Sequence, residues 1–462
     1  MKRAHIIGIC GVGMSATALL LKEAGYVVSG SDTASYGPTA RILKNAGITP
    51  NVGYSASNIP EDADLFVIGR NAKLSPTENE EVRAALATGK PVRSFPEMIG
   101  ELTHDRAVTV VAGSYGKSTT TALLAHILFE TGAGYFVGAE PLSLPAPSRL
   151  GNGVFVVEGD EYPSAHDDPR AKFMHLHPRD VILTSVVHDH VNVYPTFADY
   201  QKPFRTLLAL VPEDGLVVVC ADETGARELA EESERRVVTY GLTEGAYQAK
   251  DIHFGERTTF TLTKNGAPVI ELEIGLLGRH NVEDIVAASA YALERALISP
   301  DTLRERIASF EGVRRRLDRI TPAGAIPAYE GFGSSYEKAR AAIEAIRLHF
   351  PDKALVIVFE PHTFGWRNRA NLPWYDSVFA GAAKVFVAPP ESQGKSTHDQ
   401  LSHEELLGRT GMTGIETLPY DPQHPEAVAD SLSGNEVVLI LTSGDFEGSL
   451  PSLVERIAAR TF

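Results

Sequence analysis

The chain has 462 residues, too many for one hydrophobic core, and this length indicates roughly two to four domains. Its composition, with 43% hydrophobic and 22% charged residues, is typical of a soluble globular protein. The net charge of −16 argues against a nucleic-acid partner, and the two cysteines, Cys10 and Cys220, exclude a disulfide framework or a cysteine-rich zinc site.

Strand-like apolar runs alternate with helical patterns along almost the whole chain, which predicts α/β units on parallel sheets. The expected strands, in chain order, are 5–10, 26–28, 65–68, 108–112, 154–157, 181–185, 216–219, 354–359, 384–388 and 437–441. Helices are expected from the first glycine turn through residue 24, over 41–46 and over 281–297, and an antiparallel hairpin over 252–274. Breaks in the pattern near 102–106 and 316–322 divide the chain into three domains, 1–105, 106–318 and 319–462. Because we find neither a signal peptide nor an apolar run long enough to span a membrane, we expect a cytoplasmic protein without a membrane partner.

The most informative stretch is V-T-V-V-A-G-S-Y-G-K-S-T-T-T, from Val108 to Thr121. An apolar strand breaks into a glycine turn, and a lysine and hydroxyls follow at the start of a helix, as a phosphate cradle requires. The expected nucleotide-binding residues are Gly113, Ser114, Gly116, Lys117, Ser118 and Thr119, with Lys117 at the phosphates and the Ser118 hydroxyl on Mg²⁺. Only two residues separate Gly113 from the Gly-Lys pair, whereas the general phosphate-loop pattern has four between its first glycine and Gly-Lys. An ordinary strand–turn–helix is therefore the alternative. We predict that the chain binds a nucleoside triphosphate.

A second glycine turn lies near the N-terminus, where Gly11-x-Gly13-x-x-Ala16 follows a strand and opens a helix. Asp32 lies about 20 residues beyond Gly11, after a second strand, as in the dinucleotide-binding fingerprint. The turn predicts binding of a nucleotide diphosphate without specifying the nucleotide. The alternative is that the glycines only permit close packing of helix on strand.

Together, and in this order, the two turns resemble those of the Mur ligase family of cell-wall amino-acid and peptide ligases, and the resemblance covers the whole chain. G-I-C-G-V-G-M-S and S-G-S-D are similar to the family's UDP-sugar domain, and G-S-Y-G-K-S-T-T to its G-T-H-G-K-T-T-T. L-G-R-H-N-V-E-D at 277–284 resembles G-x-H-N-x-x-N, and G-V-R-R-R-L-D at 312–318 resembles G-V-K-R-R-L-E. The implied fold is an N-terminal Rossmann-like domain, a central P-loop ATPase-like domain and a C-terminal Rossmann-like domain.

The resemblance implies an ATP- and Mg²⁺-dependent ligase that phosphorylates the carboxylate of UDP-N-acetylmuramate and then accepts an amine. The implied catalytic residues are Lys117, Glu158, His190 and Arg316, and the implied metal ligands are Ser118, Glu158 and His190. His280, Asn281 and Arg316 are expected at the adenine or the phosphates, and Gly11, Gly13, Met14, Ser15, Ser31 and Asp32 at the UDP-sugar. The alternatives are a zinc site in the histidine-rich region around His190 and a merely solvated arginine run at Arg316.

Within the family, E-G-D-E-Y-P-S-A-H-D-D-P-R-A-K-F at 158–173 is similar to the peptidoglycan-recycling branch. That branch joins the peptide L-Ala-γ-D-Glu-meso-diaminopimelate to UDP-N-acetylmuramate, so Arg170 and Lys172 are expected to bind substrate. G-V-G-M-S and E-P-H look more like the branch that adds free L-alanine, which is the alternative. In the last domain, Arg367 and Arg369 are candidates for binding an acidic peptide.

One segment departs from the family, because E-G-F-G-S-S-Y-E-K at 330–338 stands where D-D-Y-G-H-H-P-T-E is usual. The change removes an acid and two histidines, which leaves open another amine substrate, reduced activity, or a nucleotide-binding protein without catalysis. An NAD-dependent dehydrogenase is a further alternative, although it explains the first domain alone. We expect a monomer or dimer whose domains rotate on ligand binding.

Overall fold

The computed structural model describes residues 1–34, 37–70, 72–190, 193–390 and 399–460. These residues form two compact units: the first is Met1–Asp251, Phe260–Glu273 and His280–Phe310, and the second is Ile252–Thr259, Ile274–Arg279 and Glu311–Phe462. The predicted α/β class is confirmed, because the described strands form three sheets that are rich in parallel pairs. The division into three domains stays a prediction: its second boundary at 316–322 falls on a strand inside the second unit.

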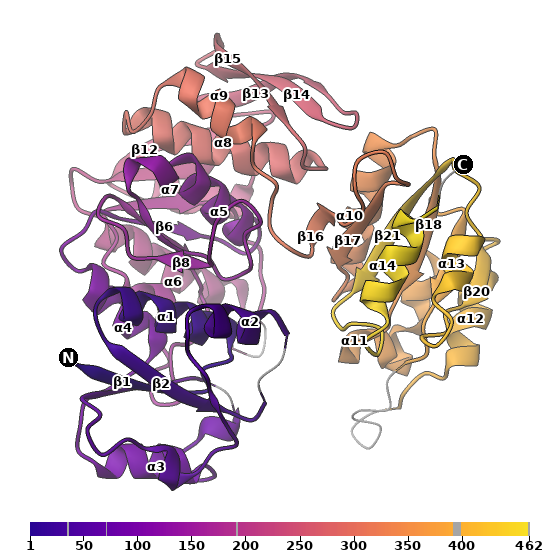
Figure 1. Ribbon diagram of the computed structural model, residues 1–462. Coiled ribbons are helices and arrows are strands. Elements are labelled where there is room, and N and C mark those ends of the chain that lie inside the picture. The colour runs from indigo at the N-terminus through magenta and orange to yellow at the C-terminus, as the bar shows by residue number, and fades with distance from the viewer. Residues whose placement is uncertain (35–36, 71, 191–192, 391–398, 461–462) are drawn as a thin grey trace. The chain divides into compact units, whose positions relative to one another are not determined.

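The N-terminal sheet has the strand order β3-β2-β1-β4-β5 and is parallel throughout. Its elements are β1 (Arg3–Ile7), α1 (Val12–Glu23), β2 (Val27–Asp32), α2 (Gly37–Asn45), β3 (Asn51–Val52), β4 (Leu65–Ile68), α3 (Glu80–Ala87), β5 (Val92–Arg93) and α4 (Phe95–Thr103). Helices α1, α2 and α4 lie on one face of this sheet and α3 on the other (Figure 1). Apolar side chains of these helices pack against the strands on each face. The strand order reverses at β1, so the glycine turn after β1 lies where open α/β sheets bind ligands.

The central sheet has the order β15-β14-β13-β12-β11-β10-β6-β9-β7-β8. Its strands are β6 (Val108–Ala112), β7 (Gly134–Phe136), β8 (Ser148–Arg149), β9 (Phe155–Gly159), β10 (Asp180–Leu183), β11 (Leu216–Cys220), β12 (Arg236–Gly241), β13 (Tyr247–His253), β14 (Thr258–Lys264) and β15 (Ala267–Ile274). The helices are α5 (Lys117–Ile127), α6 (Phe197–Leu210), α7 (Thr224–Glu231), α8 (Arg279–Glu294) and α9 (Pro300–Ala308). Asn265 and Gly266 join β14 to β15 with φ of 49° and 79°, the type I′ geometry that a tight hairpin favours.

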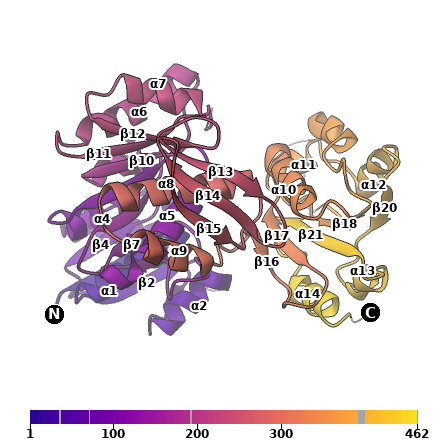
Figure 2. The same ribbon diagram turned by 90° about the horizontal axis from the view of Figure 1, so that it is seen from above.

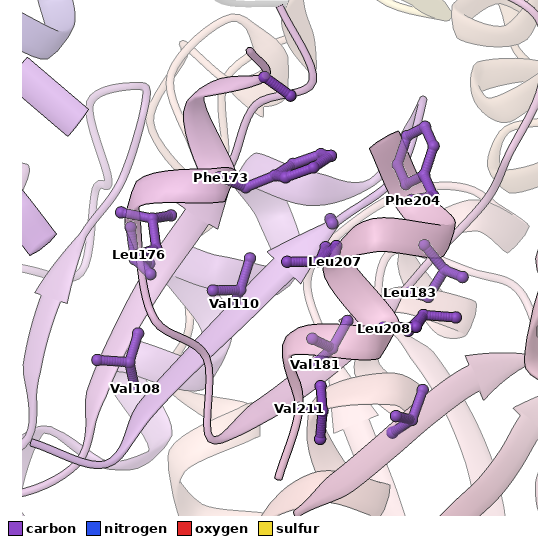
Figure 3. Close-up of a cluster of buried hydrophobic side chains, with 14 of the residues drawn as sticks. Val108, Val110, Phe173, Leu176, Val181, Leu183, Phe204, Leu207, Leu208 and Val211 are labelled. Carbon is purple, nitrogen blue, oxygen red and sulfur yellow. The ribbon is translucent and has the colours of Figure 1, made fainter. Parts of the chain in front are cut away.

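The helices of this domain cover both faces of the sheet, with α6 and α7 on one side and α5 and α8 on the other (Figure 2). Alternate side chains of β6 and β10 point to the α6 face, and Figure 3 shows them beneath the apolar residues of α6. Thr109, which alternates with these, instead hydrogen-bonds Tyr291 of α8. The buried sheet therefore gives β6 and β9 fixed carboxyl ends, from which the site is built.

The second unit contains a sheet of order β16-β17-β21-β18-β19-β20, in which only the β16–β17 pair is antiparallel among the pairs described. Its strands are β16 (Arg316–Arg319), β17 (Ala328–Phe332), β18 (Ala354–Phe359), β19 (Lys384–Val387), β20 (Glu416–Pro419) and β21 (Glu436–Thr442). Its helices are α10 (Tyr336–His349), α11 (Phe364–Arg367), α12 (His403–Gly411), α13 (Glu426–Asp430) and α14 (Leu450–Ala458). Helices α10 and α12 pack on one face, and α13 and α14 on the other. In the described parts of the chain, no helix is long and apolar enough to cross a membrane.

Candidate active site

The loop between β6 and α5 has a backbone that only glycine permits at two positions. Gly113 and Gly116 have φ of 144° and 79°. A Cβ at Gly113 would lie 2.2 Å from Thr184 Oγ1, and one at Gly116 would lie 2.5 Å from Asp284 Oδ1. Helix α5 begins directly afterwards, with no acidic residue in its first turn and, as far as the chain is described, no side-chain cap on its first N–H groups. The loop and Lys117 therefore fit an anionic triphosphate.

The side chain of Ser114 ties this loop to the segment that follows β10. Its hydroxyl donates to the Val187 carbonyl at 2.7 Å and hydrogen-bonds Tyr200 Oη at 2.8 Å. The N–H of Ser114 donates to the Ser185 carbonyl at 3.0 Å, and the N–H of Tyr115 donates to Ser185 Oγ at 2.9 Å. These bonds fix the shape of the loop, and the expected contact of Ser114 with a nucleotide stays a prediction.

Glu158 lies at the end of β9, which pairs in parallel with β6 and so places its carboxylate beside the loop. Ser118 Oγ donates to Glu158 Oε1 at 3.0 Å, and the N–H of Gly138 donates to Oε2 at 2.8 Å. Burial raises the pKa of Glu158, against the opposing charge of Lys117 and these hydrogen bonds. A carboxylate and a hydroxyl are the hard oxygen ligands that Mg²⁺ accepts together with substrate phosphates, so this pair fits the metal.

A second carboxylate, Glu161, was not selected from the sequence, although it stands three residues after Glu158 in E-G-D-E. Its side chain is 1% exposed and accepts hydrogen bonds from Lys117 Nζ at 2.9 Å, His190 Nε2 at 3.2 Å and Tyr200 Oη at 3.2 Å. Burial would raise its pKa, but the donors His190 and Lys117 lower it to about 2. The hydrogen bond to Glu161 in turn raises the pKa of His190.

The structure thus separates the three predicted metal ligands: Ser118 hydrogen-bonds Glu158, whereas His190 pairs with Glu161, which was not among them. Over the described ranges, no three His, Cys, Asp or Glu residues gather to hold a metal ion by themselves. This arrangement is the usual one for Mg²⁺, which relies on phosphate oxygens and water for its remaining ligands. Among the described residues around His190 there is no closed set of ligands for a zinc site. The metal role of His190 stays a prediction.

The N-terminal glycine turn is organised around Asp32. Its carboxylate accepts the N–H of Cys10 at 2.8 Å and the hydroxyl of Tyr54 at 3.1 Å. Gly8, which lies outside the Gly11-x-Gly13-x-x-Ala16 pattern, has φ of 86°, and its carbonyl accepts the N–H of Gly11 at 3.1 Å. Gly13 lies against the ring of Phe95, which a Cβ would approach to 3.2 Å. Asp32 therefore stabilises the backbone of the glycine turn through its side-chain hydrogen bonds.

Three other residues expected at the UDP-sugar have buried side chains. Met14 belongs to the apolar cluster beneath the sheet, and the hydroxyl of Ser15 donates to the Val12 carbonyl at 3.0 Å. The hydroxyl of Ser31 donates to the buried carboxylate of Glu81. Their side chains support the turn in this structure, and a direct contact with substrate stays a prediction for them as for Gly11 and Gly13.

A cavity of about 220 Å³ lies between the glycine turn and the central sheet, lined by Val12, Gly13, Phe95, Phe136, Glu158 and Lys172 among others. Lys172 pairs with Asp160 and lies 5.6 Å from the ring centroids of both Phe95 and Tyr162. One wall of the cavity is therefore the predicted sugar-nucleotide turn, and the other carries the carboxylate beside the phosphate loop. Arg170 is 61% exposed at its side chain and pairs with Asp168 at 2.8 Å.

The residues expected at the adenine lie at the start of α8, where His280 is exposed and Asn281 is buried. Asp284 on the same helix accepts a hydrogen bond from Thr120 Oγ1 at 2.9 Å and so attaches α8 to the helix of the phosphate loop. Arg316 is exposed at the start of β16 in the second unit. Contacts of these residues with nucleotide stay predictions.

In the second unit, the residues that depart from the family pattern have structural partners. Ser335 caps α10 and accepts the N–H of Lys338 at 3.4 Å. Glu330 is buried and lies 3.0 Å from Arg315. Of the two arginines proposed for an acidic peptide, Arg367 is buried on α11, whereas Arg369 pairs with Asp399 at 2.8 Å and with Glu405.

Two family models match the chain: the Mur ligase family catalytic domain over residues 3–107 and the Mur ligase middle domain over 111–292. A UDP-N-acetylmuramate–L-alanine ligase of Chlorobium phaeobacteroides (strain BS1) is 32% identical over 96% of this chain and 94% of its own length. The corresponding enzyme of Aquifex aeolicus (strain VF5) is 31% identical over 89% of this chain and 88% of its own. The chain belongs to the Mur ligase family and is an ATP-dependent ligase that forms amide bonds, which removes the dehydrogenase alternative.

Solved structures agree on the fold. The UDP-N-acetylmuramate–alanine ligase of Thermotoga maritima matches with a TM-score of 0.81 at 24% identity, covering 99% of both chains. A UDP-N-acetylmuramate:L-alanyl-gamma-D-glutamyl-meso-diaminopimelate ligase from Neisseria meningitides matches with a TM-score of 0.62 at 32% identity, covering 68% of this chain and 100% of its own.

Proposed function

We propose that the protein joins the carboxylate of UDP-N-acetylmuramate to the amine of L-alanine, with ATP as the phosphoryl donor and Mg²⁺ as the metal. The observation that carries the proposal is the cavity shared by the glycine turn and Glu158, because a sugar nucleotide bound there would have its carboxylate beside the phosphate loop. We prefer L-alanine as the amine because two relatives, 32% and 31% identical over 96% and 89% of this chain, are named for L-alanine. This replaces the peptide substrate favoured from local sequence matches.

The proposed chemistry is the one that the resemblance to the family implies, and the positions of the side chains agree with it. The muramoyl carboxylate attacks the γ-phosphorus and ADP leaves; the amine then attacks the acyl phosphate, and phosphate leaves as the amide forms. Lys117 and the first turn of α5 hold the phosphates, and Ser118 and Glu158 would hold Mg²⁺, which supplies charge neutralisation when bound. Lys172, in the wall of the same cavity, would attract the carboxylate of the sugar.

A peptide amine is the second candidate, favoured by one specific observation. The Neisseria peptide ligase is 32% identical over 68% of this chain, and this identity equals that of the alanine ligase from Chlorobium. In that reading Arg170 and Lys172 belong to a segment similar to that of the peptide-adding branch. Either amine leaves the activation of UDP-N-acetylmuramate unchanged.

The test is phosphate release from ATP with UDP-N-acetylmuramate and either L-alanine, L-Ala-γ-D-Glu-meso-diaminopimelate or no amine. Release that requires L-alanine supports the proposal, and release that requires the peptide moves it to the second candidate. No release with either amine, together with measurable ATP binding, contradicts both and points to another amine, as the departures at 330–338 allow. A product of the expected mass confirms that an amide has formed.

A further inference from the structure

Three hydrogen-bond donors from three separate parts of the chain converge on the buried carboxylate of Glu161. Lys117 comes from the phosphate loop, His190 from the segment after β10, and Tyr200 from α6. The backbone carbonyl of Glu161 also accepts the hydroxyl of Tyr194 at 2.6 Å. Glu161 is thus the point at which the phosphate-binding and histidine-bearing parts of the site are joined.

Lys117 cannot keep its present partners and also bridge two phosphates. Its ammonium group has three N–H donors, and in this structure one is bonded to the Gly113 carbonyl and another to Glu161 Oε2 at 2.9 Å. Bridging the β- and γ-phosphates takes two donors, so at least one existing bond must break when ATP binds. The bond to Glu161 is the one that competes for the charge of the lysine, because carboxylate and triphosphate are both anions.

The hydrogen bonds of His190 and Tyr200 to Glu161 do not have to break when ATP binds. The His190 ring is 33% exposed and has its Nε2 directed to Glu161 Oε1, which leaves Nδ1 as its other ring nitrogen. Tyr200 is fully buried, and its hydroxyl also hydrogen-bonds Ser114 of the phosphate loop at 2.8 Å. A carboxylate behind a histidine fixes the ring orientation and its tautomer.

We propose that Glu161 is a positioning residue with two functions: it holds Lys117 until ATP displaces it, and it keeps His190 oriented throughout. The inference deepens the proposed function and rests on it only in taking ATP as the nucleotide. It predicts that one substitution at Glu161 changes ATP affinity and kcat in opposite directions. Removing the charge of Glu161 releases Lys117 and tightens ATP binding, whereas it slows turnover because His190 loses its fixed partner.

The test compares Glu161→Gln with Glu161→Asp and with Glu294→Gln as a matched control. Glu294, the last residue of α8, is also a nearly buried carboxylate. Its partners lie on strands of the same sheet: Lys264 at 2.6 Å, Arg236 at 2.5 Å and Tyr247 at 2.9 Å. The ATP dissociation constant is measured without Mg²⁺ by displacement of a fluorescent ATP analogue, and kcat is measured by phosphate release. Circular dichroism of each variant checks that it is folded.

We expect Glu161→Gln to bind ATP about three- to tenfold more tightly than wild type and to lose about 10- to 100-fold in kcat. Glu161→Asp restores wild-type ATP affinity and part of kcat, and Glu294→Gln changes neither. Weaker ATP binding or an unchanged kcat in Glu161→Gln overturns the inference, as does the same shift in Glu294→Gln. Wild-type protein that fails to bind ATP overturns the proposed function itself, so the two failures are distinguishable.

Discussion

The contact between Gly138 and Glu158 predicts a large kinetic effect from one added methyl group. A Cβ on Gly138 would lie 2.8 Å from both carboxylate oxygens of Glu158, whereas ordinary contact begins at 3.4 Å. In Gly138→Ala the carboxylate must therefore move by roughly 0.6 Å, which disturbs its hydrogen bonds with Ser118 and with the Gly138 N–H. Since a displacement of about 1 Å can cost about 100-fold in rate, we expect kcat to fall about 10- to 100-fold, or roughly 1.4–2.7 kcal/mol.

The matched control is Gly153→Ala in the same domain, where the nearest atoms to a Cβ are 3.5 Å away and nothing needs to move. The assay is steady-state phosphate release with ATP, UDP-N-acetylmuramate and L-alanine, together with the ATP dissociation constant. We expect ATP affinity to change less than about threefold in both variants, because the phosphate loop itself is untouched. A Gly138→Ala protein with the kcat of Gly153→Ala would refute the assignment of Glu158 to the reacting centre.

Three further predictions concern the phosphate loop, the metal and the N-terminal domain. Lys117→Met should lower kcat/KM for ATP at least about 100-fold in the same assay, and an undiminished value would remove this lysine from the phosphates. Chelation with EDTA should abolish phosphate release, and added Mg²⁺ should restore it; activity that persists in EDTA contradicts a metal requirement. Burial would raise the pKa of Glu81, but hydrogen bonds from His5, Ser31, Asn58 and the Ser55 N–H lower it from 4.5, so its contribution to stability is full above pH 4.5 and is lost as pH falls through the folded pKa. Glu81→Gln should flatten the decline of the urea midpoint between pH 5 and pH 3, roughly the range that the lowered pKa defines, and an unchanged slope would show that another group unfolds this domain.

Local patterns in the sequence were enough to place the phosphate loop and the first glycine turn. The β-branched run before Gly113 is buried as β6, and the lysine that follows Gly116 begins α5, as the order of residue types predicted. The Asn265–Gly266 hairpin within 252–274 was also predictable, because those residue types favour positive φ at both positions. Each of these features depends on residues that are neighbours in the chain.

The role of Glu161 could not be predicted in this way, since its three partners come from distant positions and meet only in the folded sheet. The sequence showed a second carboxylate in E-G-D-E but not which donors would reach it. Burial was the other missing information, because Met14 of the glycine turn and Ser31 of the S-G-S-D segment both have buried side chains. Ser335 stands where the family pattern has a histidine, and in the structure it caps helix α10.

The packing between the first two sheets bears on how the enzyme prepares its substrates. Ala16 and Leu20 of α1 and Ile99 of α4 belong to the same buried cluster as Val108 and Val110 of β6. The cavity wall formed by the glycine turn and the wall that carries Glu158 therefore rest on the same hydrophobic core. The distance between the two walls is consequently set when the protein folds. Binding the first two substrates need not align these walls, so less conformational entropy is lost on binding. An enlarging substitution such as Ala16→Leu, far from any reacting atom, would consequently act on catalysis by changing the spacing across the cavity.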